Sequence, residues 1–190
     1  NNTSAQNNLG FLYHNGTGVT QSFAKAKELF HAAAEAGDPS AQYNLGYLYS
    51  KGRGVEQNME EAVNWFLKAA LQGHTNAQFQ LALCYKSGSG IAPNEEEAIK
   101  WLTVAANEGH TNAQYSLGLL YKQQSSKKSI DYAMKWLSRA ASNEHVSACF
   151  DLGLLYKSLQ QFENAFKWLK RAAVKGHKDA QYELGYFYLH

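Results

Sequence analysis

A nine-residue pattern recurs six times along the chain at nearly constant spacing, and it restricts the fold to a repeat architecture. The pattern, which reads A-x-x-x-L-G-x-x-Y in its common form, begins at Ala5, Ala41, Ala77, Ala113, Ala148 and Ala180. The intervals are 36, 36, 36, 35 and 32 residues. Periods of this length belong to arrays of supersecondary units that stack on their neighbours.

A second pattern follows each of the first five copies and has a helical period. Its copy at Ala62 reads AVNWFLKAA, which places apolar residues at i, i+3, i+4, i+7 and i+8. The first pattern carries an apolar stripe of the same kind, so each unit is predicted to be a helical hairpin. We therefore expect an all-α, single solenoid domain over residues 1–190, with five full hairpins plus one terminal helix. The expected repeats start near residues 3, 39, 75, 111, 146 and 178.

The ends of the predicted helices carry recognisable signals. A glycine follows each second helix and fits a left-handed cap, at Gly37, Gly73, Gly109 and Gly176. Glu144 replaces it in the fourth repeat, where we expect a less regular turn. Starts of the next first helix are predicted at Asp38-Pro39, at Thr75 with Gln78, and at Thr111 with Gln114.

Glycine also recurs inside the first helix, where it costs about 1 kcal/mol relative to alanine. Gly46 has counterparts in every copy except the third, which has Ala82. A costly residue at a fixed place predicts a close approach by the facing helix, where a side chain would not fit.

The stretches GTGV, GRGV and GSGI begin at Gly16, Gly52 and Gly88. Paired glycines beside basic residues can bind phosphate, but such a loop occurs once and lies between a strand and a helix. These three stretches hold one position in successive repeats and join the two helices of a hairpin. They are interpreted as connectors.

The combined pattern, with G-x-G-[VI] between the helices and A-x-x-W-x-x-x-A-A-x-x-G at the end, resembles the Sel-1-like repeat, a relative of the tetratricopeptide repeat. The resemblance covers nearly the whole chain. It implies a right-handed α-solenoid with first helices on the concave face, and a role as an adaptor or scaffold. Repeats four and five depart from it, because KQQSSKKS and a short connector replace G-x-G.

No residue set points to catalysis, a cofactor or a metal. The histidines after the cap glycine, for example His74 and His110, hold a turn position that recurs once per repeat, where repeat one has Asp38, so they cannot converge on one ion. The tryptophans hold one second-helix position and are interpreted as core. Cys84 and Cys149 are too few and too far apart for a disulfide framework. We expect no catalytic residues, no cofactor and no metal.

The resemblance implies a protein or peptide partner, and the charges give no indication of a nucleic-acid partner. Eighteen basic and sixteen acidic residues alternate without a basic stripe, so no nucleic acid is expected. No apolar run is long enough to cross a bilayer, so no direct membrane insertion is expected.

The first-helix face opposite the core stripe is the candidate partner-binding surface. It is predicted to comprise Asn8, Phe11, Tyr43, Asn44, Tyr47, Phe79, Gln80, Lys86, Tyr115 and Lys122. Two interpretations of the aromatic row stay open, packing between repeats and ligand binding. Amides in the N-terminal half give way to Asp151 and Glu183, which predicts that position along the face also selects a ligand. A passive spacer and a hydrolase are the competing functions.

The C-terminal helix, residues 178–190, keeps the full apolar pattern with no second helix after it. The opening NNTSAQ has neither methionine nor an apolar leader, so the chain is expected to be part of a longer protein. Weak self-association through this last helix is the expected consequence.

Overall fold

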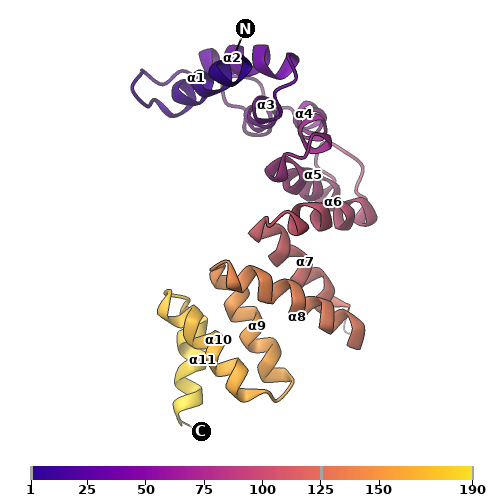
Figure 1. Ribbon diagram of the computed structural model, residues 1–190, viewed down its shortest axis with the longest axis vertical. Coiled ribbons are helices and arrows are strands. Elements are labelled where there is room, and N and C mark those ends of the chain that lie inside the picture. The colour runs from indigo at the N-terminus through magenta and orange to yellow at the C-terminus, as the bar shows by residue number, and fades with distance from the viewer. Residues whose placement is uncertain (1, 125, 190) are drawn as a thin grey trace. The chain divides into compact units, whose positions relative to one another are not determined.

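The chain is a series of helical hairpins. The computed structural model describes residues 2–124 and 126–189, with side chains described as far as Phe187. Every element in these residues is a helix (Figure 1). The helices are α1 (Thr3–Asn15), α2 (Phe23–Glu35), α3 (Pro39–Lys51), α4 (Met59–Leu71), α5 (Thr75–Ser87), α6 (Glu95–Asn107), α7 (Thr111–Gln123), α8 (Lys127–Ser142), α9 (Val146–Ser158), α10 (Phe162–Val174) and α11 (Lys178–Leu189). The prediction of an all-α chain with five hairpins and a terminal helix is confirmed.

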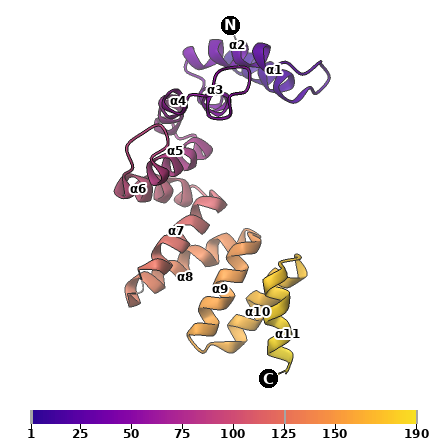
Figure 2. The same ribbon diagram turned by 180° about the vertical axis from the view of Figure 1, so that it is seen from behind.

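Contacts divide the chain into two units, Asn1–Ala105 and Ala106–His190. In the first unit α1 packs on α2 and α3 on α4, while α2 also contacts α3 and α4 contacts α5. In the second unit each helix from α7 to α11 packs on the next, and Figures 1 and 2 show α9, α10 and α11 side by side. The expectation of one domain over residues 1–190 stays a prediction.

Small residues let the helices of a hairpin approach closely. A Cβ on Gly46 would lie 2.8 Å from the ring of Phe66 and 3.1 Å from the carbonyl oxygen of Ala62. Gly10, Gly118 and Gly153 are equally constrained by the facing second helix. The predicted close approach is therefore confirmed for these glycines, whereas a Cβ on Gly185 would meet no atom within 4 Å.

The first helices begin at side-chain caps, of which the one at Asp38 was expected and the histidine caps were not. The Asp38 carboxylate accepts the N–H of Ala41 at 2.8 Å. In later repeats a histidine takes this place, and its Nδ1 accepts the N–H three residues on, at His74, His110, His145 and His177. The predicted starts are confirmed, because α5 begins at Thr75 and α7 at Thr111, but the preceding histidine and not the threonine is the cap.

The glutamine of the recurring Ala-Gln pair joins three first helices, α3, α7 and α11, to the second helix before them. The Nε2 of Gln42 donates to the carbonyl of Ala34 at 3.2 Å, and Gln114 donates to Ala106 at 3.0 Å. Each of these carbonyls also accepts the N–H of the glycine that follows its helix, Gly37 or Gly109, so the glutamine amide is a second donor to the last turn. For Gln114 this role replaces the predicted capping box, in which the glutamine would have turned back on its own helix. The box predicted for Thr75 with Gln78 does not cap α5, because His74 accepts the N–H of Ala77 instead.

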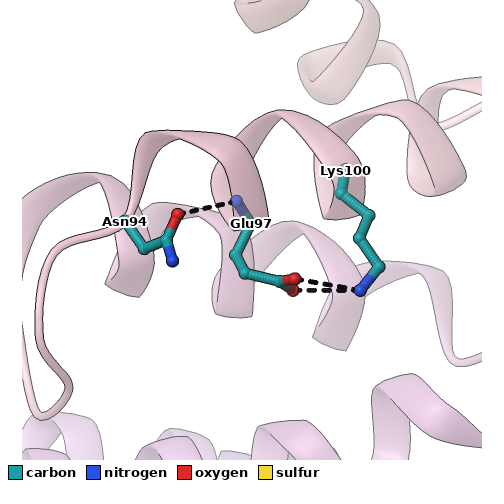
Figure 3. Close-up of polar contacts among 3 residues, drawn as sticks. All are labelled: Asn94, Glu97 and Lys100. Atoms are coloured by element: carbon teal, nitrogen blue, oxygen red, sulfur yellow. Dashed lines mark hydrogen bonds and ion pairs between the residues drawn. The ribbon is translucent and has the colours of Figure 1, made fainter.

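The second helices before α10 begin at a serine or asparagine cap, whereas the Gln161 side chain does not cap α10. Asn94 Oδ1 accepts the N–H of Glu97 at 3.1 Å at the start of α6, and Glu97 also pairs with Lys100 (Figure 3). The paired glycines lie just before such caps. Gly54 has a φ of 70°, and a Cβ there would lie 2.6 Å from the backbone of Phe23 in the preceding repeat. The second glycine thus allows one connector to pack on the repeat before it, which supports the connector interpretation.

Repeats four and five lack Gly-x-Gly, and their connectors differ from each other. In repeat four α8 starts early and has 16 residues, against 13 in α4. In repeat five Gln160 adopts a φ of 59° in the short connector. Glu144 also has a positive φ of 65°, and its carboxylate pairs with Lys175 at 3.0 Å.

The turn at Glu144 is regular, contrary to expectation. The N–H of His145 donates to the carbonyl of Ala140 at 3.1 Å, as that of His74 donates to Ala69 at 3.0 Å. Glutamate therefore keeps the glycine geometry and carries the cost of a left-handed backbone, about 1 kcal/mol.

We expect Gly46→Ala to lower the free energy of unfolding by about 1–3 kcal/mol, because the added methyl group must displace a buried ring. Gly185→Ala should be neutral or stabilise by up to about 1 kcal/mol, because the methyl group meets nothing and alanine favours the helix. Urea denaturation followed by circular dichroism measures both. Equal losses in the two variants would contradict the close approach.

The histidine caps predict a pH-dependent stability. Burial is the main cause that lowers the pKa of His74, His110 and His145 below the ordinary value. A capping Nδ1 must be unprotonated, and the nearby Asp38 and Asp151 offset burial only in part. The unfolded chain therefore takes up protons first, so stability is full above about pH 7 and falls as the pH drops through about 6.5.

Loss of these caps should cost about 1 kcal/mol each by pH 5. The variant His74→Asp/His110→Asp/His145→Asp should flatten this pH dependence, because aspartate stays ionised in the window and already caps α3 as Asp38. Urea midpoints from pH 5 to 8 provide the measurement. An unchanged slope in the variant would show that other groups titrate.

Candidate functional site

Much of the predicted aromatic row lies in the junctions between repeats. Its rings stack on the capping histidine of the next repeat, with centroids 4.8 Å apart for Tyr43–His74 and 4.3 Å apart for both Tyr115–His145 and Phe150–His177. Burial raises the pKa of Tyr43 above its ordinary value. Tyr43 and Tyr115 therefore have a packing role, whatever else they contact. Phe79 in the same row is half-buried.

In the second unit the polar groups of this face bind one another. Asp151 accepts the hydroxyl of Tyr115 at 2.9 Å and pairs with Lys122 at 2.9 Å. Burial, followed by this hydrogen bond, raises the pKa of Tyr115 to about 12. Glu183 pairs likewise with Lys157 at 2.6 Å. Asp151 and Glu183, expected to select a ligand by position, are thus used inside the protein.

The predicted polar site residues of the first unit differ in their exposure and contacts. Asn8 and Lys86 are exposed, and Gln80 is half-buried. Asn44 is the exception, because its Nδ2 donates to Asn7 Oδ1 at 2.9 Å and so links α3 to α1.

A cavity of about 220 Å³ lies on the first-helix side of repeats one and two. Four of the predicted site residues line it, Phe11, Tyr43, Asn44 and Tyr47. The other two lining residues are His14 and the core residue Phe30. Phe11 is 52% exposed, which is unusual for so large an apolar side chain. The structure thus brings Phe11, Tyr43, Asn44 and Tyr47 together and leaves the other predicted residues outside this cavity.

Sequence reasoning missed His14 and Phe30 for different reasons. His14 holds the position that Lys86 and Lys122 hold in their repeats, so its alignment with the lysine row could have indicated it. Phe30 belongs to the apolar stripe of α2 and is 1% exposed, so no pattern separates it from the core. It contributes the floor of the cavity.

A cationic group adjoins this cavity. The guanidinium of Arg53 lies 5.7 Å from the ring centroids of both Phe23 and Tyr47. Its Nη1 lies 3.4 Å from Nε2 of His14. The connector between α3 and α4 therefore places a charged side chain against residues of the first repeat.

The remaining reactive residue types do not form a second site in the described part of the chain. No group of three or more metal-binding side chains occurs within residues 2–124 and 126–189. Trp65 and Trp136 are each 6% exposed and belong to the core. No helix described here is long and apolar enough to cross a membrane.

The fold and its junctions define a protein of the helical-hairpin repeat class, an α-solenoid. Sel1 repeats match at residues 3–38, 39–74, 75–110, 111–145, 146–177 and 178–190. The chain belongs to the Sel1 repeat family. Proteins of this family are generally interaction scaffolds without enzymatic activity, and they typically bind other proteins.

Solved structures support this assignment. A Sel1 repeat protein from Oxalobacter formigenes is 33% identical, with a TM-score of 0.88 over 100% of this chain and 80% of the other. The protective antigen c5321 of uropathogenic Escherichia coli, which has an SLR fold, is 27% identical, with a TM-score of 0.56 over 96% of this chain and 48% of the other.

Immunity protein Pa5087 from Pseudomonas aeruginosa is 20% identical, with a TM-score of 0.60 over 94% of this chain and 67% of the other, a likeness of fold alone. A comparison with curated protein sequences gives no match.

Proposed function

We propose that this protein is a non-enzymatic scaffold that binds an extended peptide of a partner protein on the first-helix side of repeats one and two. The cavity between α1 and α3 is the observation that carries the proposal, because four residues chosen from the sequence line it. Exposed aromatic rings beside amides suit an extended peptide, since the rings take side chains and the amides can pair with its backbone.

The second unit supports the choice of repeats one and two. There Lys122 and Lys157 are engaged by acidic residues of the next repeat, so the corresponding positions are less open to a ligand. The sequence predicted binding along the whole first-helix face, including Asn8, Phe79 and Gln80. We restrict the proposed binding site to the cavity and its rim.

The test is selection of a phage-displayed library of random linear peptides against the purified protein. Peptides that are recovered should bind Asn44→Ala/Tyr47→Ala about 30-fold more weakly, because truncation of a central aromatic anchor typically costs about 2 kcal/mol. Isothermal titration calorimetry measures the affinity, and circular dichroism verifies that the variant is folded. Tyr182→Ala, which removes a tyrosine that is 79% exposed on α11, is the matched control.

Failure to recover any peptide, or equal binding by the double variant, would contradict this assignment. The first outcome would favour a passive spacer between other domains.

We also propose weak self-association through the last helix. A cavity of about 450 Å³ is lined by Lys157, Phe162, Tyr186 and Phe187. Phe162 is 56% and Tyr186 50% exposed, and within the described residues no second helix covers α11 as α10 covers α9. A second copy offers the same apolar face, which makes a self-complementary contact available.

Sedimentation velocity at increasing concentration should show a monomer–dimer equilibrium in the wild type. Phe162→Ser/Tyr186→Ser should remain monomeric at the same concentrations, because both side chains line the apolar cavity. Leu71→Ser, which removes an apolar side chain that is 70% exposed on α4, should behave as the wild type. A wild type that stays monomeric throughout would refute the contact.

A further inference from the structure

We propose that the peptide bound at the α1–α3 cavity carries an aspartate or glutamate side chain that pairs with Arg53. The inference rests on the proposed function and specifies its ligand: an apolar side chain enters the cavity, and a carboxylate of the same peptide binds the guanidinium beside it.

Arg53 is already held in place before any ligand arrives. The rings of Phe23 and Tyr47 lie at equal distances from the guanidinium, 5.7 Å to each centroid. Nδ1–H of His14 donates to Asn15 Oδ1 at 2.8 Å, which leaves Nε2 to accept from Arg53 at 3.4 Å. A fixed guanidinium loses little further rotamer freedom on binding, and its other N–H groups keep a planar fork that suits a carboxylate.

In the described part of the chain no ion pair with a carboxylate balances this charge. Among the described residues, 2–124 and 126–189, the ion pairs involve neither Arg53 nor the adjacent Lys51. The helices that flank the cavity, α1 and α3, contain no aspartate or glutamate at all. Lys122 and Lys157 on the first-helix face of the second unit, by contrast, do have acidic partners.

The guanidinium and the cavity share residues, which limits the spacing within the ligand. His14 and Tyr47 line the cavity and also contact Arg53. In an extended peptide, side chains two positions apart point to the same side. An acidic residue two positions from an apolar residue therefore fits both features at once.

A purely structural role for Arg53 is the alternative, because it contacts Phe23 of α2 and His14 of α1 and could fasten repeat two to repeat one. Arg53→Gln would then lower the urea midpoint and leave the preference of the protein for acidic peptides unchanged. The two roles are separated by measuring stability and affinity on the same variant.

The experiment uses the library-selected peptides that depend on Tyr47. We expect them to carry an acidic residue two positions from an apolar one. Replacement of that acid by its amide should weaken binding to the wild type roughly 10-fold or more, as expected for a charge-assisted hydrogen bond. The same replacement should have little effect on binding to Arg53→Gln, and raised salt should weaken only the acidic peptide.

Lys68→Gln is the matched control, because it removes a cation that lies 3.8 Å from the Trp65 ring centroid on another face of the same unit. It should retain the preference for the acid. Peptides that need Tyr47 but lack an acidic residue, or that lose equal affinity on amidation with wild type and Arg53→Gln, would overturn this inference alone. Peptides that bind independently of Tyr47 would instead overturn the proposed function.

Discussion

The hydrogen bonds where each first helix meets the preceding second helix are the interactions on which the array depends. A helical hairpin whose facing residues are largely alanine and glycine buries too little by itself, so its remaining apolar surface must meet a neighbour. At that junction Gln42 donates to a carbonyl at the end of α2, and Asp38 accepts an N–H at the start of α3. Later junctions use a histidine cap on which an aromatic ring stacks. The buried polar groups of both helix ends are thereby paired at one place.

First-helix residues that form contacts between repeats are less open to a ligand, so these contacts determine which surface remains open. In the second unit the aromatic and charged positions join neighbouring repeats, so recurrence there reflects assembly of the array. In the first unit the two helices that flank the cavity, α1 and α3, contain no acidic residue, and an aromatic cavity beside Arg53 remains. Departures from a repeat pattern can therefore indicate a binding site better than its most regular positions do.

The sequence predicted the hairpins, the glycine contacts and the helix caps at Gly37 and its counterparts, because each depends on local backbone geometry or on helical period. It placed Tyr43 and Tyr47 on the right helix but could not separate packing from binding, which depends on contacts with residues about 30 positions away. The capping histidines were seen as a repeated turn position, yet their Nδ1 bonds were missed because threonine is the commoner cap. Arg53 was not predicted as a site residue, because its loop was interpreted as a connector and only the fold brings it against Phe23.

Cys149 stands where other repeats have the junction glutamine, and its thiol lies 3.7 Å from the carbonyl of Ala141. Burial raises the pKa of this thiol, and also that of Cys84 in the core of the first unit. A thiol in such a place reacts with an alkylating reagent only when the surrounding helices separate. Each unit thus contains one buried cysteine whose alkylation rate reports local opening of the helices around it. Comparison of the two rates would show whether the two units open at the same rate.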